Sequence, residues 1–305
     1  MCSVRRIALT VLAIVVLAGC RGPVSGTAVP APTSPGPTAP VGALDPGSYP
    51  TTPLPPLGAA GSDEVGRLVE GRRMAAYVVG PWQVDPSLTN SRRTGALVID
   101  DRRQLGAVLW PDVIAPTWHQ PFIVAFSSER RAANPKDPTM LRNAVLRFAT
   151  AASAAAVAQG ISSAALKTPT VTNADSPIPV GPIRPVPIPG HPDITGALAM
   201  HRDGNQDVQE VTVVSAHGVY VLIHVADSGQ DADHAAAVAG HALDLQAPLI
   251  DKFQPTEPAQ FLNLPLDPTG LVARTLPLKA GHADSMSNAA YAAAAELHLE
   301  DDPVQ

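Results

Sequence analysis

Cysteine is nearly absent from this chain of 305 residues, which contains only Cys2 and Cys20. Everything after position 20 therefore carries no thiol and can form no disulfide. This excludes thiol catalysis, zinc–thiolate sites and iron–sulfur clusters from the body of the protein. A domain without disulfides must be held together by its own core, and the length of the chain permits one.

Aromatic and charged residues are also scarce, at 4% and 16%, whereas 45% of the chain is hydrophobic. The core must therefore be built largely from Ala, Val, Leu and Ile. The formal net charge of −6 indicates an acidic surface, which disfavours nucleic acid and anionic lipid headgroups as partners.

The first 20 residues have the pattern of an export signal. Two arginines precede the apolar run of residues 7–18, which ends in LAGC with the cysteine at position 20. A membrane-spanning helix would need about 20 apolar residues, and Arg21 ends this run too early. The segment resembles the lipobox of bacterial lipoproteins, in which the cysteine receives a diacylglyceryl group and becomes the first residue after cleavage. We therefore predict cleavage between Gly19 and Cys20, and lipid attachment at Cys20 on the outer (extracytoplasmic) face of the cell membrane. An ordinary cleaved signal is the alternative.

A proline-rich segment follows the signal. Residues 21–61 contain eleven prolines, almost no charge and no apolar period, so they cannot build a core. We predict a disordered spacer that spans roughly 35–40 Å as a flexible coil and up to about 130 Å as polyproline II. Loss of residues 1–19, which carry two arginines and no acidic residue, changes the net charge from −6 to −8.

The remaining chain predicts an α+β fold. Apolar periodicity and caps favour helices over residues 62–79, 140–166 and 231–253, and strands over 96–99, 105–110, 122–126, 195–200, 208–215 and 219–225. The second proline-rich stretch, 176–192, is predicted to be an edge strand or a surface crossing. This order of elements indicates a largely antiparallel sheet with helices packed on one face.

No motif for chemistry is found. The chain has no G-x-S-x-G elbow, no phosphate-binding or dinucleotide loop and no H-E-x-x-H. Residues 203–207 depart from a calcium loop and are interpreted as a polar hairpin turn. His234 and His241 lie about 10.5 Å apart along a helix, too far to share a metal ion, and the spacing of His217 and His224 predicts opposite faces of a strand. The sequence therefore predicts no catalytic residue, no metal site and no cofactor.

Three segments, LDPGSYPT (44–51), RMAAYVVGPW (73–82) and RTLPL (274–278), resemble an uncharacterised lipoprotein family of high-GC Gram-positive bacteria. The resemblance implies no activity and no catalytic residues. Family members continue into a further C-terminal half that opens much like LHLEDDPV at 297–304. The resemblance therefore implies a shortened chain in which residues 283–305 are the stub of a second α+β unit. Together with the patterns above, this predicts a signal peptide (1–19), a lipid-anchored tether (20–61) and a globular α+β domain (62–282) before the stub.

Two functions from different classes remain open. The first is a binding or scaffolding module displayed on the cell surface, anchored through Cys20, with an envelope protein or lipid as partner. The second is an envelope hydrolase or a carrier of apolar ligands. A deep apolar cavity or a converging Ser/His/Asp set would favour the second function, and a shallow polar surface would favour the first.

Overall fold

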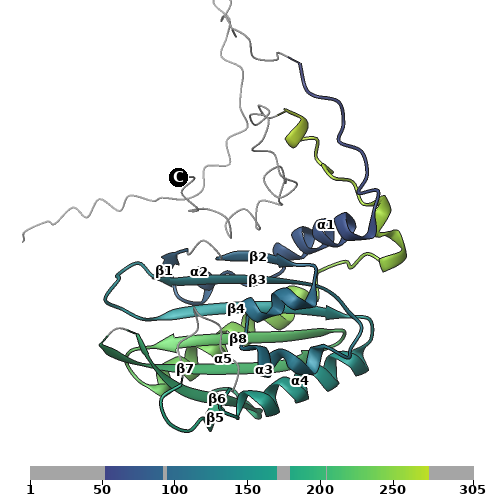
Figure 1. The fold of residues 1–305 in the computed structure, drawn as a ribbon. Helices are drawn as coiled ribbons and strands as arrows, with labels where there is room; N and C mark the ends of the chain where they lie inside the picture. The colour runs from purple at the N-terminus through teal and green to yellow at the C-terminus, as the bar shows by residue number, and fades with distance from the viewer. Residues whose placement is uncertain (1–51, 92–94, 170–178, 204, 275–305) are drawn as a thin grey trace, which may run out of the picture. The chain divides into compact units, whose positions relative to one another are not determined.

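The computed structural model describes residues 52–91, 95–169, 179–203 and 205–274 (Figure 1). The predicted signal peptide, the lipid-attachment residue Cys20, most of the predicted tether and the predicted stub at 283–305 lie outside these residues.

Within the described residues, eight strands form one sheet in the order β1-β3-β4-β8-β7-β6-β5, with β2 also paired to β3 (Figure 1). All neighbouring strands are antiparallel. The predicted antiparallel α+β class is confirmed. The strands are β1 (Leu88–Asn90), β2 (Ala96–Ile99), β3 (Phe122–Ala132), β4 (Met140–Phe148), β5 (Arg184–Ile188), β6 (His191–Asp203), β7 (Gln206–His217) and β8 (Tyr220–Ser228).

Helices cover both faces of this sheet, so the prediction of helices on one face is wrong. Helices α1 (Asp63–Ala75) and α5 (Ala232–Ile250) share one apolar cluster with alternate residues of β8, such as Leu222. Helices α3 (Pro111–Ile114) and α4 (Ala151–Ala165) share the other cluster with the intervening residues, such as Ile223. Because successive strand residues point to opposite faces, central strands that are apolar throughout require a cover on each side. The shorter helices are α2 (Pro81–Val84), η1 (Arg102–Ala107), η2 (Ala115–Thr117), η3 (Pro258–Asn263) and η4 (Val272–Arg274).

Two predicted elements are corrected. The helix expected over 140–166 is strand β4 followed by helix α4, which Thr150 caps by accepting a hydrogen bond from the amide of Ser153. Residues 140–148 are buried on both faces, so their apolar pattern also fits a helix. No strand forms over 105–110: residues 105–107 end the 3₁₀ helix η1, which begins where the side chain of Asp101 caps the amide of Arg103 and starts a turn.

Other predicted elements are confirmed. Strands β2, β3, β6 and β7 contain the predicted strands, β8 begins one residue after its predicted start, and α5, capped by Asp231, lies within the helix predicted over 231–253. Among the described strands, β5 pairs only with β6 and forms an edge, as its prolines indicated. Strands β7 and β8 form the predicted hairpin, in which His217 pairs with Tyr220 and Gly218 adopts a φ of 58° that favours glycine.

The last residues of the predicted tether lie along the C-terminal part of the body. The amide of Leu54 donates to the carbonyl of Ala273, and Ala59 forms a β-bridge with Pro265. The amide of Gly61 donates to the carbonyl of Leu262. Residues 54–61 are therefore attached to the folded body by backbone hydrogen bonds immediately before α1 begins.

Candidate functional site

An open pocket of about 360 Å³ lies where α1 begins. Its walls come from the first turns of α1, from the residues that link β2 to η1 and from the first residue of β3. Seven of its eight lining residues are charged, namely Asp63, Glu64, Arg67, Asp100, Asp101, Arg102 and Arg103. The eighth is the aromatic Phe122. The pocket is therefore a charged surface feature rather than an apolar cavity.

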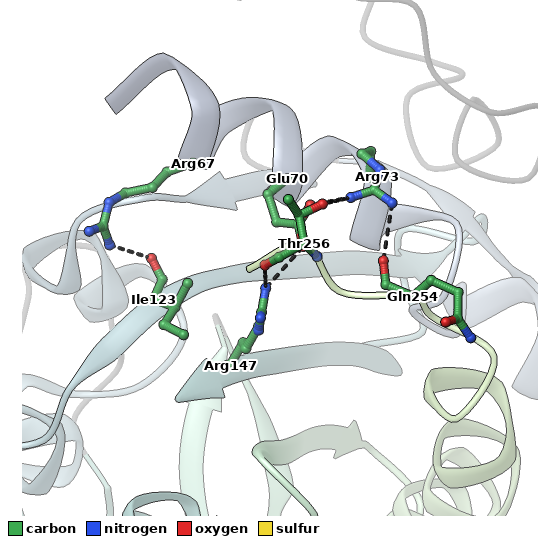
Figure 2. Close-up of polar contacts among 7 residues, drawn as sticks. All are labelled: Arg67, Glu70, Arg73, Ile123, Arg147, Gln254 and Thr256. Carbon is green, nitrogen blue, oxygen red and sulfur yellow. Dashed lines mark hydrogen bonds and ion pairs between the residues drawn. The ribbon is translucent and has the colours of Figure 1, made fainter. Parts of the chain in front are cut away.

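The arginines of the pocket have partners within the protein. Arg67 donates to a carboxylate oxygen of Asp63 at 2.8 Å. It also donates to the carbonyl of Ile123 at 2.8 Å (Figure 2). Arg102 donates to the carbonyl of Trp118. These bonds fix the positive groups in place and leave them less able to bind an added anion.

The acidic groups of the pocket are less evenly paired. Arg103 hydrogen-bonds to Asp101 and thereby lowers the pKa of this carboxyl below its usual value. In the part of the chain that the structure describes, the side chains of Glu64 and Asp100 have no ion-pair partner. The lining therefore holds four carboxylates and three guanidinium groups, a net charge of −1 that suits a positively charged partner.

A buried carboxylate holds α1, the helix that carries this pocket, against the sheet (Figure 2). Glu70 is fully buried, and its Oε1 accepts from the amide of Thr256 at 2.7 Å and from Arg147 Nη1 at 3.0 Å. Its Oε2 accepts from Arg73, which also donates to the carbonyl of Gln254 at 3.1 Å. The network joins α1, β4 and the segment after α5, so it fixes the position of α1 on the body.

The sheet face covered by α4 carries a second polar cluster, formed by His201, Glu210 and Asp227 from β6, β7 and β8. Each residue offers a ligand atom that lies within 4.8 Å of the other two, and His201 Nε2 lies 4.0 Å from Asp227 Oδ2. His201 and Asp227 are buried, whereas Glu210 is half-buried. Nitrogen and carboxylate oxygen atoms in this arrangement are able to hold a metal ion.

Burial changes the acid–base properties of this cluster. It raises the pKa of Glu210 to about 7, against the attraction of Arg142, which lowers it. Burial also raises the pKa of Asp227 well above its usual value, and the adjacent Glu210 raises it further. Arg142 itself pairs with Glu129 and donates to the carbonyl of Val108 at 2.8 Å. The two carboxyl groups are therefore able to share one proton or to bind one cation between them.

The histidines that the sequence singled out do not come together. His234 Nδ1 lies 3.0 Å from the hydroxyl of Ser228, while His241 is exposed on α5. His217 and His224 point to the same face of the sheet, so the prediction of opposite faces is wrong. The hairpin turn at Gly218 separates them, and the alternation of a single strand does not continue through a turn.

His217 and His224 each have a polar partner that holds the side chain in the fold. His217 Nε2 lies 2.7 Å from Asp251 at the end of α5. His224 is buried, and its Nδ1 lies 2.8 Å from the side-chain oxygen of Asn143. Burial lowers the pKa of His224 to about 3, and the neighbouring His191 lowers it further. His224 is therefore neutral at physiological pH.

Sequence reasoning missed the cluster of His201, Glu210 and Asp227. The available signal was Glu210, a charged residue among apolar ones in the predicted strand 208–215. In an antiparallel sheet with both faces covered, such a residue indicates a buried polar site. The sequence did not give the strand register that brings its partners to it. The two residues predicted to flank the cleavage site, Gly19 and Cys20, lie outside the described residues.

Residues 57–266 match the family described as a domain of unknown function (DUF7373), N-terminal. The chain belongs to the DUF7373 family. Both the charged pocket and the polar cluster of this DUF7373 chain lie within the matched residues. No curated protein matches the chain. Among solved structures, the extracellular domain of PknH from Mycobacterium tuberculosis is similar to it, at 14% sequence identity and a TM-score of 0.41, over 60% of this chain and 97% of that chain.

Among the described residues, no helix is both long and apolar enough to span a membrane.

Proposed function

We propose that this DUF7373 protein is an exported lipoprotein, attached through Cys20 to the outer face of the cell membrane, whose body binds an envelope partner through the charged pocket. The observation that carries the binding function is the pocket itself, which is open and lined by seven charged residues and one aromatic residue. The anchor rests on the signal pattern that ends at Gly19 and Cys20.

The chemistry of the pocket favours a binding module over the two alternatives. A carrier of apolar ligands needs a cavity lined mainly by apolar side chains, and here Phe122 is the apolar member of the lining. A serine hydrolase needs a nucleophile beside a base, and the pocket's lining contains neither serine nor histidine. Charged side chains held at a solvent-open surface are instead suited to recognising a charged partner.

The partner that fits best is a basic segment of another envelope protein. Glu64 and Asp100 have no ion-pair partner among the described residues, and the four carboxylates of the lining outnumber its three guanidinium groups by one. The overall negative charge of the chain adds a long-range attraction for a basic partner. Binding should therefore weaken as the salt concentration rises, because exposed charges are screened.

The anchor is tested by Cys20→Ala in the native host, followed by detergent partitioning and mass determination of the protein. We expect this variant to leave the detergent phase or to accumulate as uncleaved precursor, while wild type carries a diacylglyceryl group on Cys20. Normal processing and unchanged membrane retention of the variant would contradict the anchor.

The binding surface is tested by placing a photo-crosslinking amino acid at Arg103, which is exposed at the pocket, and at His241 on α5 as the matched exposed control. We expect a discrete adduct from position 103 in intact cells and none from position 241. Adding Glu64→Lys and Asp100→Lys should abolish that adduct. Equal adducts from both positions, or an adduct that survives charge reversal, would count against the pocket as the binding surface.

A further inference from the structure

We propose that His201, Glu210 and Asp227 form a binding site for one divalent first-row transition metal ion, such as Zn²⁺ or Mn²⁺. The inference is independent of the charged pocket at α1 and of the lipid anchor. It rests on the geometry of three adjacent strands, on an unpartnered buried oxygen and on the charges around it.

The three strands hold the ligands in a fixed register. Glu210 of β7 pairs directly with Asp227 of β8, so the two carboxylates lie side by side on one face. His201 of β6 pairs with Val208, two residues before Glu210, so its side chain lies diagonally next to Glu210 on that same face. All three come from paired strands of the sheet rather than from loops, and rigid elements place metal ligands most accurately.

The spacing of the ligand atoms is close to that of an occupied site. They lie within 4.8 Å of one another, and His201 Nε2 and Asp227 Oδ2 are 4.0 Å apart. Around a tetrahedral zinc ion with bonds of about 2.1 Å, ligand atoms lie about 3.4 Å apart. Side-chain rotations that move each atom by roughly 1 Å would therefore close the site, and the backbone could stay in place.

An unpartnered oxygen provides the second and independent observation. Asp227 is only 4% exposed, and its Oδ1 accepts no hydrogen bond from any residue that the structure describes. A buried carboxylate oxygen without a partner is costly, because it has lost its water and gained nothing in exchange. A metal ion between Asp227, Glu210 and His201 would compensate this loss.

The surrounding charges leave room for a cation. Three carboxylates, those of Glu129, Glu210 and Asp227, lie among two guanidinium groups, those of Arg131 and Arg142. Arg142 is engaged with Glu129, which leaves Glu210 and Asp227 with less compensation. Glu210 itself is half-buried, whereas His201 and Asp227 are buried.

The ligand types indicate which metal ions would bind. An imidazole together with two carboxylates suits Zn²⁺ and Mn²⁺, while Mg²⁺ and Ca²⁺ prefer sites made of oxygen alone. Three protein ligands also leave a coordination position open for water or another small ligand. The alternative occupant is a proton shared between Glu210 and Asp227, which would make metal binding unnecessary.

The test is calorimetric titration of ZnCl₂ and MnCl₂ into the full-length protein, purified without a histidine tag in detergent and stripped with EDTA. We expect one site for each metal in wild type. His201→Gln and Asp227→Asn should each weaken binding about tenfold or more, while His241→Gln, an exposed histidine on α5, should leave it unchanged. CaCl₂ should bind at least tenfold more weakly than ZnCl₂.

Three results would overturn the proposal: no uptake of Zn²⁺ or Mn²⁺ by wild type, equal affinity in His201→Gln, or loss of binding in His241→Gln. Since a ligand variant could fail to fold, its circular dichroism in EDTA is compared with that of wild type. An anomalous difference map from wild-type crystals soaked in MnCl₂ decides independently. A peak between His201, Glu210 and Asp227 supports the site, and a peak elsewhere or none contradicts it.

Discussion

Replacing Glu70 with alanine should destabilise the protein more than any surface change on the same helix. Glu70 is fully buried, with its Oε1 bonded to the amide of Thr256 at 2.7 Å and to Arg147 at 3.0 Å, and its Oε2 bonded to Arg73. Glu70→Ala leaves Arg147 buried without a carboxylate and removes the acceptor of the Thr256 amide. The variant therefore retains the cost of burying these groups and loses what compensated it.

The magnitude follows from burial. The side chain of Arg147 is 6% exposed, and breaking a buried ion pair by removing one partner costs about 3–5 kcal/mol in free energy of unfolding. The side chain of Arg73 is 37% exposed, so the loss of its contact with Glu70 adds little. For a domain of this size, each kcal/mol lowers the melting temperature by about 2–4 °C. The melting temperature should fall by roughly 6–20 °C.

Urea unfolding followed by circular dichroism measures this loss. Asp63→Ala on the same helix is the matched control, because the Asp63–Arg67 pair is exposed and its removal should cost about 1 kcal/mol or less. The double variant Glu70→Leu/Arg147→Met, which removes both buried charges, should recover most of the loss. If Glu70→Ala costs no more than Asp63→Ala, the network does not fix α1 to the body and this reasoning fails.

Three further predictions concern pH, packing and capping. Folding lowers the pKa of His224 from 6.5 to about 3, so between pH 3 and pH 6.5 this histidine binds more protons in the unfolded protein than in the folded protein. Wild type should therefore lose stability as pH falls from 6.5, and His224→Asn should lose less, as shown by urea midpoints at pH 7 and pH 4.5. In Gly66→Ala the new Cβ would lie 2.5 Å from the backbone oxygen of Phe261, so the variant should lose about 1–3 kcal/mol in urea unfolding although alanine favours helices. Asp231→Ala removes the cap of α5 and should cost about 1 kcal/mol, measured in the same way, and a smaller loss than in Gly66→Ala is expected.

The strands that could be predicted from the sequence are those with clear turn signals beside them. The β7–β8 hairpin was found because Gly218 and its neighbours separate two apolar runs, and β5 because its prolines exclude a central position. The sequence of strand β4 predicts a helix, because Leu141, Val145 and Phe148 also have helical spacing. A strand covered on both faces has no polar face, so its period of two is not visible in the sequence. The same lack of a polar face explains why the sequence predicts a helix in place of β4 and helices on one face of the sheet only.

The polar cluster and the pocket could not be predicted because each depends on contacts between distant segments. Arg67 reaches the carbonyl of Ile123, 56 residues along the chain, and Glu210 meets Asp227 only through the register of β7 and β8. Periodicity predicts which side of an element is buried, but it does not predict which partner lies opposite. The sequence predicts the antiparallel α+β class, but it does not predict which residues the fold brings together at the pocket and at the polar cluster.

The Glu70 network also determines when α1 can dock during synthesis. Thr256 follows Glu70 by 186 residues, and a chain grows from its N-terminus at about 5–20 residues per second. The backbone partner of the carboxylate is therefore made about 10–40 s after Glu70, whereas Ile123 and Arg147, which also bond to α1, are made earlier. In an exported chain, as proposed above, the Glu70 network would be completed only after most of the described body has been made. The first described helix is thus fixed in part by one of the last described segments of the chain.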